Sequence, residues 1–151
     1  MEAHYYHVEI NWNTDRKGMM CSPELRQSGG TCIEVATPPE FPKGIPGMWS
    51  PEHLFTAAVS SCLMTTFLSI AENSKLPFLH FTCASKGKLE QVDGKLMMSE
   101  IVLEPVVTIS DEKDREKAER VLQKSEAACL ISNSVKSKVT MLPRIKIEVT
   151  K

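Results

Sequence analysis

The sequence predicts a single α+β domain that covers residues 1–151. Three features support this class: a strand-rich start, a long helix almost without charge after residue 50, and a hairpin followed by a second helix and a closing strand. A chain of 151 residues is long enough to bury a substantial core. It shows no internal repeat, low-complexity tract or domain break.

The first forty residues are expected to form an antiparallel meander. Stretch 3–12, "AHYYHVEINW", mixes aromatic and β-branched residues in rough alternation, and "NTDRKG" follows as a turn. Stretches 19–25, "MMCSPEL", and 31–38, "TCIEVATP", are predicted strands joined by the tight connection "RQSGG". Residues 37–54 hold five prolines and two glycines, which predicts an ordered loop of the kind that often carries function.

A long helix is predicted to begin directly after this loop. Ser50 can cap its free N–H groups, Pro51 suits the first helical position, and Glu52 complements the positive end of the helix dipole. The helix should run to about Ser74. Because it is apolar nearly all round, we expect it to be buried at the centre of the fold or at an interface.

Residues 76–150 complete the predicted fold. Two strands should flank the turn "VDGK", since Asp93-Gly94 is a strong hairpin signal. An amphipathic helix capped by Ser110 should then run to Cys129. A short turn, "SNSVKSK", and a closing strand, 139–150, follow.

Charge and composition exclude several classes of function. The formal net charge is −1, so there is no electrostatic case for nucleic acid or an acidic membrane as a partner. The start lacks the pattern of a signal peptide, and we expect no run of about 20 apolar residues that would span a membrane. The expected location is the cytoplasm.

The five cysteines are expected to be free thiols. Their odd number argues against a disulfide framework, and no C-x-x-C spacing or histidine cluster indicates a metal site. Cys21, Cys32 and Cys83 are predicted to be small buried hydrophobic residues. Cys62 and Cys129 differ because each lies at or near a helix face that should point inward, although their spacing does not establish proximity.

Two stretches resemble a known family. "WSPEHLFTAAVSSCLMTTF" together with "AACLISNSV" is similar to the osmotically inducible protein C and organic hydroperoxide resistance family, OsmC/Ohr. The matching motif is Pro-Glu-x-Leu-x(6)-Ser-Cys, joined to Cys-x-(Ile/Val)-Ser downstream. The resemblance implies an OsmC-like fold over nearly the whole chain, with antiparallel sheets around a long buried central helix.

The resemblance also implies a thiol peroxidase. Cys62 would be the peroxidatic residue, and Cys129 would resolve its sulfenic acid as a disulfide. An external dithiol, which the resemblance to the hydroperoxide members implies to be of the lipoyl type, would reduce that disulfide, and no metal or other cofactor is implied. A cysteine in mid-helix gains nothing from the helix N-terminus, so a cation must stabilise its thiolate. The resemblance assigns this role to Arg16, held by Glu52, while Arg26 is a rival.

Helix geometry adds a prediction about assembly. Glu52 and Cys62 are ten residues apart, which places them about 15 Å apart along one helix and on different faces. A shared site would therefore need Glu52 from a second subunit, which predicts an intertwined homodimer.

Two features leave a second function open. Leu130 follows the second cysteine where hydroperoxide members of the family commonly have proline. The proline-rich loop 37–54 is also unlike that of the best-characterised peroxidases. The alternative function is therefore a non-catalytic protein of the same fold that binds a small ligand or senses redox state.

Overall fold

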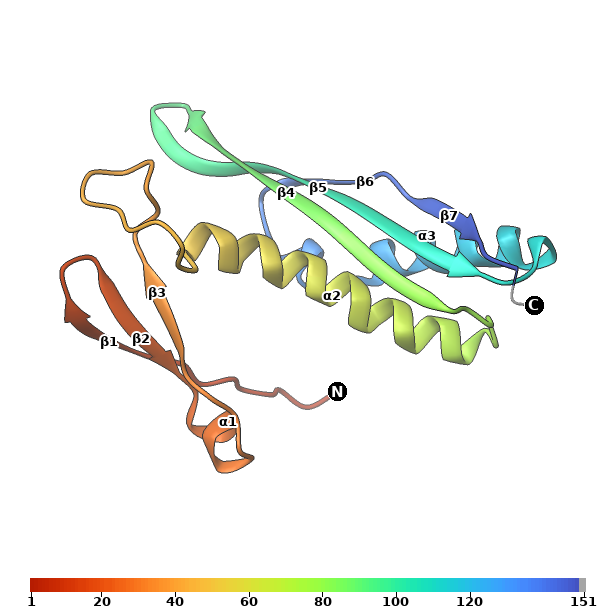
Figure 1. The fold of residues 1–151 in the computed structure, drawn as a ribbon, viewed down its shortest axis with the longest axis horizontal. Coiled ribbons are helices and arrows are strands. Elements are labelled where there is room, and N and C mark those ends of the chain that lie inside the picture. Colours follow the sequence, from red (N-terminus) through yellow and green to blue (C-terminus); the bar gives the residue numbers. More distant parts are fainter. Residues whose placement is uncertain (150–151) are drawn as a thin grey trace. The chain divides into compact units, whose positions relative to one another are not determined.

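The computed structural model describes residues 1–149 and divides them into two compact units, 1–54 and 55 onward. Each unit contains a β-sheet and helical segments, which confirms the α+β class (Figure 1). That the chain acts as a single domain stays a prediction.

The first unit is built on a three-stranded antiparallel sheet in the order β1-β2-β3, so the predicted meander is confirmed. Its strands are β1 (Glu9–Thr14), β2 (Lys17–Cys21) and β3 (Ile33–Ala36). β1 begins later than predicted. Gly18 is required where β1 and β2 meet, because a Cβ there would press against the backbone oxygen of Asn11.

The connection between β2 and β3 differs from the prediction. Residues 22–25 were expected to continue a strand, but Pro23–Gln27 form the short helix α1. Pro23 explains the difference, because it has no N–H for a ladder and its fixed φ suits the first position of a helix. The backbone N–H of Gly30 donates to the carbonyl of Leu25 and closes the turn.

A disulfide joins Cys21 and Cys32, so the prediction that both are free, inert thiols was wrong. Met20 pairs with Ile33 in the β2–β3 ladder, which makes the two cysteines the next opposed pair. Their Cα atoms are 4.5 Å apart, the spacing of a non-hydrogen-bonded antiparallel pair. An odd number of cysteines cannot exclude one such local pair.

The proline-rich stretch after β3 is an ordered loop, as predicted. The N–H of Phe41 donates to the carbonyl of Pro38, and the N–H of Ile45 donates to the carbonyl of Thr37. The N–H of Ala36 donates to the carbonyl of Trp49. These bonds return the chain to β3 just before the long helix begins.

The second unit contains the hairpin of β4 (His80–Val92) and β5 (Lys95–Ile109), which runs along α2 in Figure 1. Asp93 and Gly94 both have positive φ, 51° and 78°, as the predicted two-residue turn requires. The predicted single closing strand is divided into β6 (Lys138–Met141) and β7 (Arg144–Ile147), both parallel to β5. Pro143 lies at the division, because proline cannot donate to a ladder.

Two helices and two short 3₁₀ turns complete the fold. The helices are α2 (Pro51–Asn73) and α3 (Arg115–Ala128), and the turns are η1 (Glu112–Asp114) and η2 (Ser132–Ser134). The N-terminus of α2 is confirmed, since Ser50 Oγ accepts the N–H of His53. The predicted cap at Ser110 was wrong: Asp111 caps η1 by accepting the N–H of Lys113, and α3 begins later, at Arg115.

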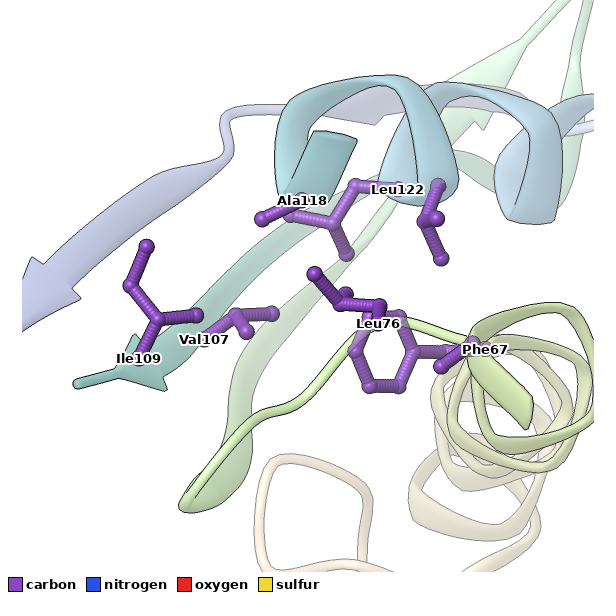
Figure 2. Close-up of a cluster of buried hydrophobic side chains, with 8 residues drawn as sticks. Phe67, Leu76, Val107, Ile109, Ala118 and Leu122 are labelled. Carbon is purple, nitrogen blue, oxygen red and sulfur yellow. The ribbon is translucent and has the colours of Figure 1, made fainter. Parts of the chain in front are cut away.

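The core of the second unit lies between the sheet and the two helices (Figure 2). Alternate residues of β5 point into it, and Phe67 of α2 stacks on Phe81 of β4 with ring centroids 4.8 Å apart. The largest cluster of fully or nearly fully buried side chains comprises Phe67, Ala71, Leu76, Val107, Ile109, Ala118, Val121 and Leu122.

Only one face of α2 is buried within the chain. Val59, Leu63 and Phe67 are fully buried, whereas Met64 and Leu68 are 40% and 43% exposed. The expectation that no segment reaches the length of a membrane span was wrong for α2, which is long and apolar enough by length and composition alone. Its buried residues nevertheless pack against a sheet, as those of a core helix do.

Candidate active site

Cys62 and Cys129 lie in contact in the second unit. Cys62 sits in the middle of α2 on its buried face, and Cys129 is the residue that ends α3. Their side chains are joined by a hydrogen bond, although both are free thiols. Cys62 is 9% exposed and Cys129 is fully buried, so bulk water has little access to the pair.

The turn after α3 fixes Cys129 in place. Its backbone N–H donates to the carbonyl of Glu126, and its own carbonyl accepts the N–H of Asn133 at 3.1 Å. Ile131 packs against the buried cluster around Val59 and Leu63 of α2. The end of α3 is therefore held against the segment of α2 that carries Cys62.

The pKa of Cys62 lies below the ordinary value of a thiol. Burial opposes ionisation, but four hydrogen-bond partners outweigh it: the Cys129 thiol, the backbone of Ile131, the Thr66 hydroxyl and the backbone of Leu130. The Thr66 oxygen lies 3.9 Å from the Cys62 sulfur, one helical turn further along α2. Cys62 therefore ionises more readily than a thiol without these partners.

The pKa of Cys129 is shifted in the opposite direction. Burial and the hydrogen bond to Cys62 raise it, and this outweighs the hydrogen bonds to Ser132 that lower it. Of the two thiols, Cys62 therefore ionises first, while Cys129 keeps its proton and donates it to the neighbouring sulfur.

Cys83 is the third free thiol and stands apart from this pair. It lies on β4, half-buried against the same core cluster, and its sulfur is 3.6 Å from the Ser85 hydroxyl. Burial raises its pKa above the ordinary value. These surroundings fit the predicted role of a small hydrophobic residue.

The two other predicted site residues belong to the first unit. Arg16 is exposed in the turn between β1 and β2, where its carbonyl accepts the N–H of Thr37. Glu52 lies in the first turn of α2, and one of its carboxylate oxygens is buried. The rival, Arg26, is exposed on α1. The action of Arg16 and Glu52 on Cys62 stays a prediction from the family resemblance.

Residues 1–149 contain no group of three or more His, Cys, Asp and Glu side chains arranged to hold a metal ion. The chemistry available at the site described above is that of two sulfur atoms. An acidified thiol beside a protonated one can act as a nucleophile and then as half of a disulfide.

The sequence did not point to three contributors to this site. Thr66 could have been found from its spacing of four residues from Cys62, which places both on one helix face. The backbone N–H groups of Leu130 and Ile131 carry no side-chain signal, because every residue except proline has such a group.

The α+β fold and the paired thiols point to the class of this protein. Residues 44–142 match the family of OsmC-like proteins, so the chain belongs to that family, as its sequence motifs indicated. A comparison with curated proteins gave no match.

Solved structures with the same fold cover nearly the whole chain. An OsmC-like protein of unknown function from Vibrio cholerae is 23% identical, with 93% of this chain and 99% of that chain covered and a TM-score of 0.80. An organic hydroperoxide resistance protein from Elizabethkingia anophelis is 19% identical, with 97% and 99% covered and a TM-score of 0.74. An organic hydroperoxide resistance protein from Legionella pneumophila is also 19% identical, with 97% of this chain and 100% of that chain covered and a TM-score of 0.72.

Proposed function

We propose that this protein is a cysteine-based thiol peroxidase that reduces organic hydroperoxides in a response to oxidative stress. The observation that carries the proposal is the contact between Cys62 and Cys129, in which the first thiol is acidified and the second holds its proton. Relatives of the same fold that are named organic hydroperoxide resistance proteins support the class of substrate.

In the first step, the Cys62 thiolate attacks the terminal oxygen of the hydroperoxide. The O–O bond breaks, the sulfur keeps the hydroxyl group as a sulfenic acid, and an alkoxide leaves. The alkoxide takes a proton from water and becomes an alcohol. The sulfur is oxidised by two electrons, and the peroxide is reduced by two.

In the second step, Cys129 resolves the sulfenic acid. Its sulfur attacks the Cys62 sulfur as its proton is released, an S–S bond forms, and the hydroxyl group leaves as water. An external dithiol then reduces this disulfide by exchange, returns two thiols and becomes a disulfide itself. The resemblance favours a lipoyl-type dithiol as this reductant.

Arg16 is proposed to add positive charge beside the Cys62 thiolate, with Glu52 holding the guanidinium. A planar guanidinium can bind a carboxylate and still face an anionic sulfur. We expect Arg16→Ala to lower the peroxidase rate at least tenfold and Arg26→Ala to leave it unchanged. A lower peroxidase rate in Arg26→Ala and an unchanged rate in Arg16→Ala would show that Arg26 supplies the positive charge.

We further propose that the protein acts as an intertwined homodimer. On α2, Met64 and Leu68 are large, exposed and one helical turn apart, with the small residues Ser61 and Thr65 on the same exposed face. Such a face lets a second helix approach closely.

The first unit adds a second exposed apolar surface on and before β1. Edge strands such as β1 that display large apolar side chains on this scale are usually covered by a partner. The exposed residues are Tyr5, Tyr6, Val8, Ile10 and Trp12.

Intact-protein mass spectrometry tests the peroxidase proposal. The protein is first reduced, freed of reductant and given one equivalent of cumene hydroperoxide. We expect prompt loss of two hydrogens, mapped by peptide analysis to Cys62–Cys129. Unchanged thiols, or oxidation confined to Cys21–Cys32, would contradict the proposal and favour the ligand-binding or redox-sensing alternative.

Light scattering tests the dimer. We expect the wild-type chain to have twice the 16.9 kDa mass of one chain, and Leu68→Glu to shift it toward the monomer. Leu96→Glu is the matched control, because Leu96 is 58% exposed at the far end of the β4–β5 hairpin. A monomeric wild-type protein at micromolar concentration would contradict the homodimer proposal.

A further inference from the structure

Cys21 and Cys32 form a disulfide at the end of the β2–β3 ladder. Both residues are partly exposed, and neither belongs to a buried cluster within residues 1–149. The other cysteine pair has the opposite surroundings, since Cys129 is fully buried and Cys62 is 9% exposed. The disulfide is therefore the cysteine pair that a dissolved reductant reaches more directly.

We propose that Cys21–Cys32 is a second redox site of this protein, at which a soluble dithiol reduces the disulfide reversibly and thereby releases α1. The inference goes beyond the proposed peroxidase function and does not depend on it, because it involves neither a hydroperoxide nor the Cys62–Cys129 pair.

Backbone pairing holds the two cysteines side by side independently of the disulfide. The β2–β3 ladder runs through Met20, which pairs with Ile33, and the cysteines follow as the next opposed pair. On the other edge of β2, Cys21 pairs with Glu9 of β1. Two thiols held in this way have a high effective concentration, so the reduced pair closes again without a search through the chain.

The helix between the two cysteines has few other attachments. α1 buries none of its five residues, and its C-terminal turn closes on itself through the bond from Gly30 N–H to the carbonyl of Leu25. The Glu24 carboxylate accepts the backbone N–H of His7 at 2.8 Å and lies 2.9 Å from its ring Nδ1. That contact is exposed to solvent and adds little stability. Because so short a helix is unstable by itself, we expect α1 to unfold locally once the disulfide opens.

The exchange has two steps. A thiolate of the dithiol attacks one sulfur of the disulfide, the S–S bond breaks, and the other cysteine leaves as a thiolate that takes a proton from water. The second thiol of the reagent then loses its proton and attacks the mixed disulfide, which releases the remaining cysteine. The protein gains two electrons and two protons, and the dithiol becomes a cyclic disulfide.

The first test measures how fast dithiothreitol reduces Cys21–Cys32 in the full-length wild-type protein. Samples in buffer and in urea are quenched with acid, alkylated and mapped by peptide analysis, with oxidised glutathione as the control for the effect of urea on the exchange itself. We expect the rate in buffer to lie within about tenfold of the rate in urea, because an accessible disulfide reacts without unfolding. A slower rate in buffer would overturn the inference.

Limited proteolysis tests the release of α1. Trypsin cleaves after Arg26, which is exposed on α1, and we expect reduction to speed this cleavage at least about tenfold, because proteolysis follows the population of the open segment. Cleavage after Arg120 of α3 is the matched control and should not change. Oxidised glutathione, added after the dithiol is removed, should restore slow cleavage. A reduced protein that is cleaved no faster at Arg26 would overturn the inference.

A variant separates this site from the proposed peroxidase. Cys62→Ser retains Cys21–Cys32, so it should give the same reduction rate and the same pattern of cleavage as the wild type. A loss of reduction in this variant would show that electrons reach the disulfide through Cys62, which would overturn direct exchange with the dithiol. Neither measurement uses a peroxide, so a failed peroxidase assay leaves both results interpretable.

Discussion

The thiol of Cys129 donates a hydrogen bond to the sulfur of Cys62, and this one bond lowers the pKa of Cys62 while it raises the pKa of Cys129. The two residues are far apart in sequence and meet because α3 ends against the middle of α2. The same contact that favours the nucleophile therefore places the resolving thiol beside it.

Removal of Cys129 should separate the two steps of the proposed cycle. In Cys129→Ser, Cys62 can still take an oxygen from a hydroperoxide, but no neighbouring thiol can displace it. We expect mass spectrometry to show one and then two added oxygen atoms on Cys62 as peroxide increases. Cys62→Ser is the control and should gain neither. A disulfide between Cys62 and Cys83 in the first variant would contradict this division of roles.

The pH dependence of alkylation should distinguish Cys62 from Cys83 within one molecule. The pKa of Cys62 is lowered by its hydrogen-bond partners, while burial raises the pKa of Cys83. We expect the midpoint of alkylation for Cys62 to lie at a lower pH than the midpoint for Cys83. Reversed midpoints would show that burial dominates at Cys62.

The lowered pKa of Cys62 also makes the stability of the folded protein depend on pH. Because the folded-state pKa of Cys62 is depressed, its ionisation stabilises the folded protein at pH values above the unfolded pKa. This contribution disappears as the pH falls through the folded-state pKa. The pKa of Cys129 is raised, so its protonated thiol stabilises the folded protein at pH values below the unfolded pKa. This contribution is lost as the pH rises through the folded-state pKa of Cys129.

Thr66 should make a smaller contribution to the lowered pKa of Cys62 than Cys129 and the backbone of Ile131 do. Its hydroxyl oxygen is 3.9 Å from the Cys62 sulfur, which is long for a hydrogen bond. We expect Thr66→Val to slow the alkylation of Cys62 about two- to fivefold at pH 7, and Thr66→Ser to leave it nearly unchanged. If both variants react alike, the hydroxyl does not act on the thiolate.

The Cys21–Cys32 disulfide should stabilise the first unit without affecting the thiol pair. It closes a loop with a sequence separation of 11, for which chain entropy gives about 3 kcal/mol. We expect the double variant Cys21→Ser/Cys32→Ser to lose stability of this order in urea unfolding. Its alkylation rate at Cys62 should match that of the wild type. A slower reaction at Cys62 would link the two pairs.

The fold was largely predictable where local chemistry decides it. Asp93-Gly94 specified its hairpin because both residues adopt positive φ with little cost. Ser50 and Pro51 specified the start of α2 because each satisfies a need of the helix N-terminus. Errors arose where one residue outweighed its neighbours, as Pro23 did when it turned a predicted strand into α1.

The site was only partly predictable for a different reason. Cys62 and Cys129 came from the family motif, but their contact depends on how α3 returns to α2, which local patterns do not encode. The Cys21–Cys32 pair depends on strand register, which the number of cysteines ignores. The donors at Leu130 and Ile131 are backbone groups, and only the three-dimensional turn distinguishes them from others.

Phe67 should be the residue of α2 on which the second unit depends most. It is fully buried, stacks on Phe81 and meets the edge of Phe78 with ring centroids 5.1 Å apart. We expect Phe67→Ala to cost about 3–5 kcal/mol of unfolding free energy, because the cavity lies between α2 and the sheet and neither can collapse into it. Urea unfolding measures the change.

Leu96→Ala is the control for this substitution, because Leu96 is 58% exposed and its truncation leaves no cavity. We expect it to change the unfolding free energy by less than about 0.5 kcal/mol. Since Phe67 and Cys62 are both buried residues of α2, the loss of Phe67 should also loosen the packing around the thiol. Similar costs for the two variants would mean that α2 does not pack on the sheet as described.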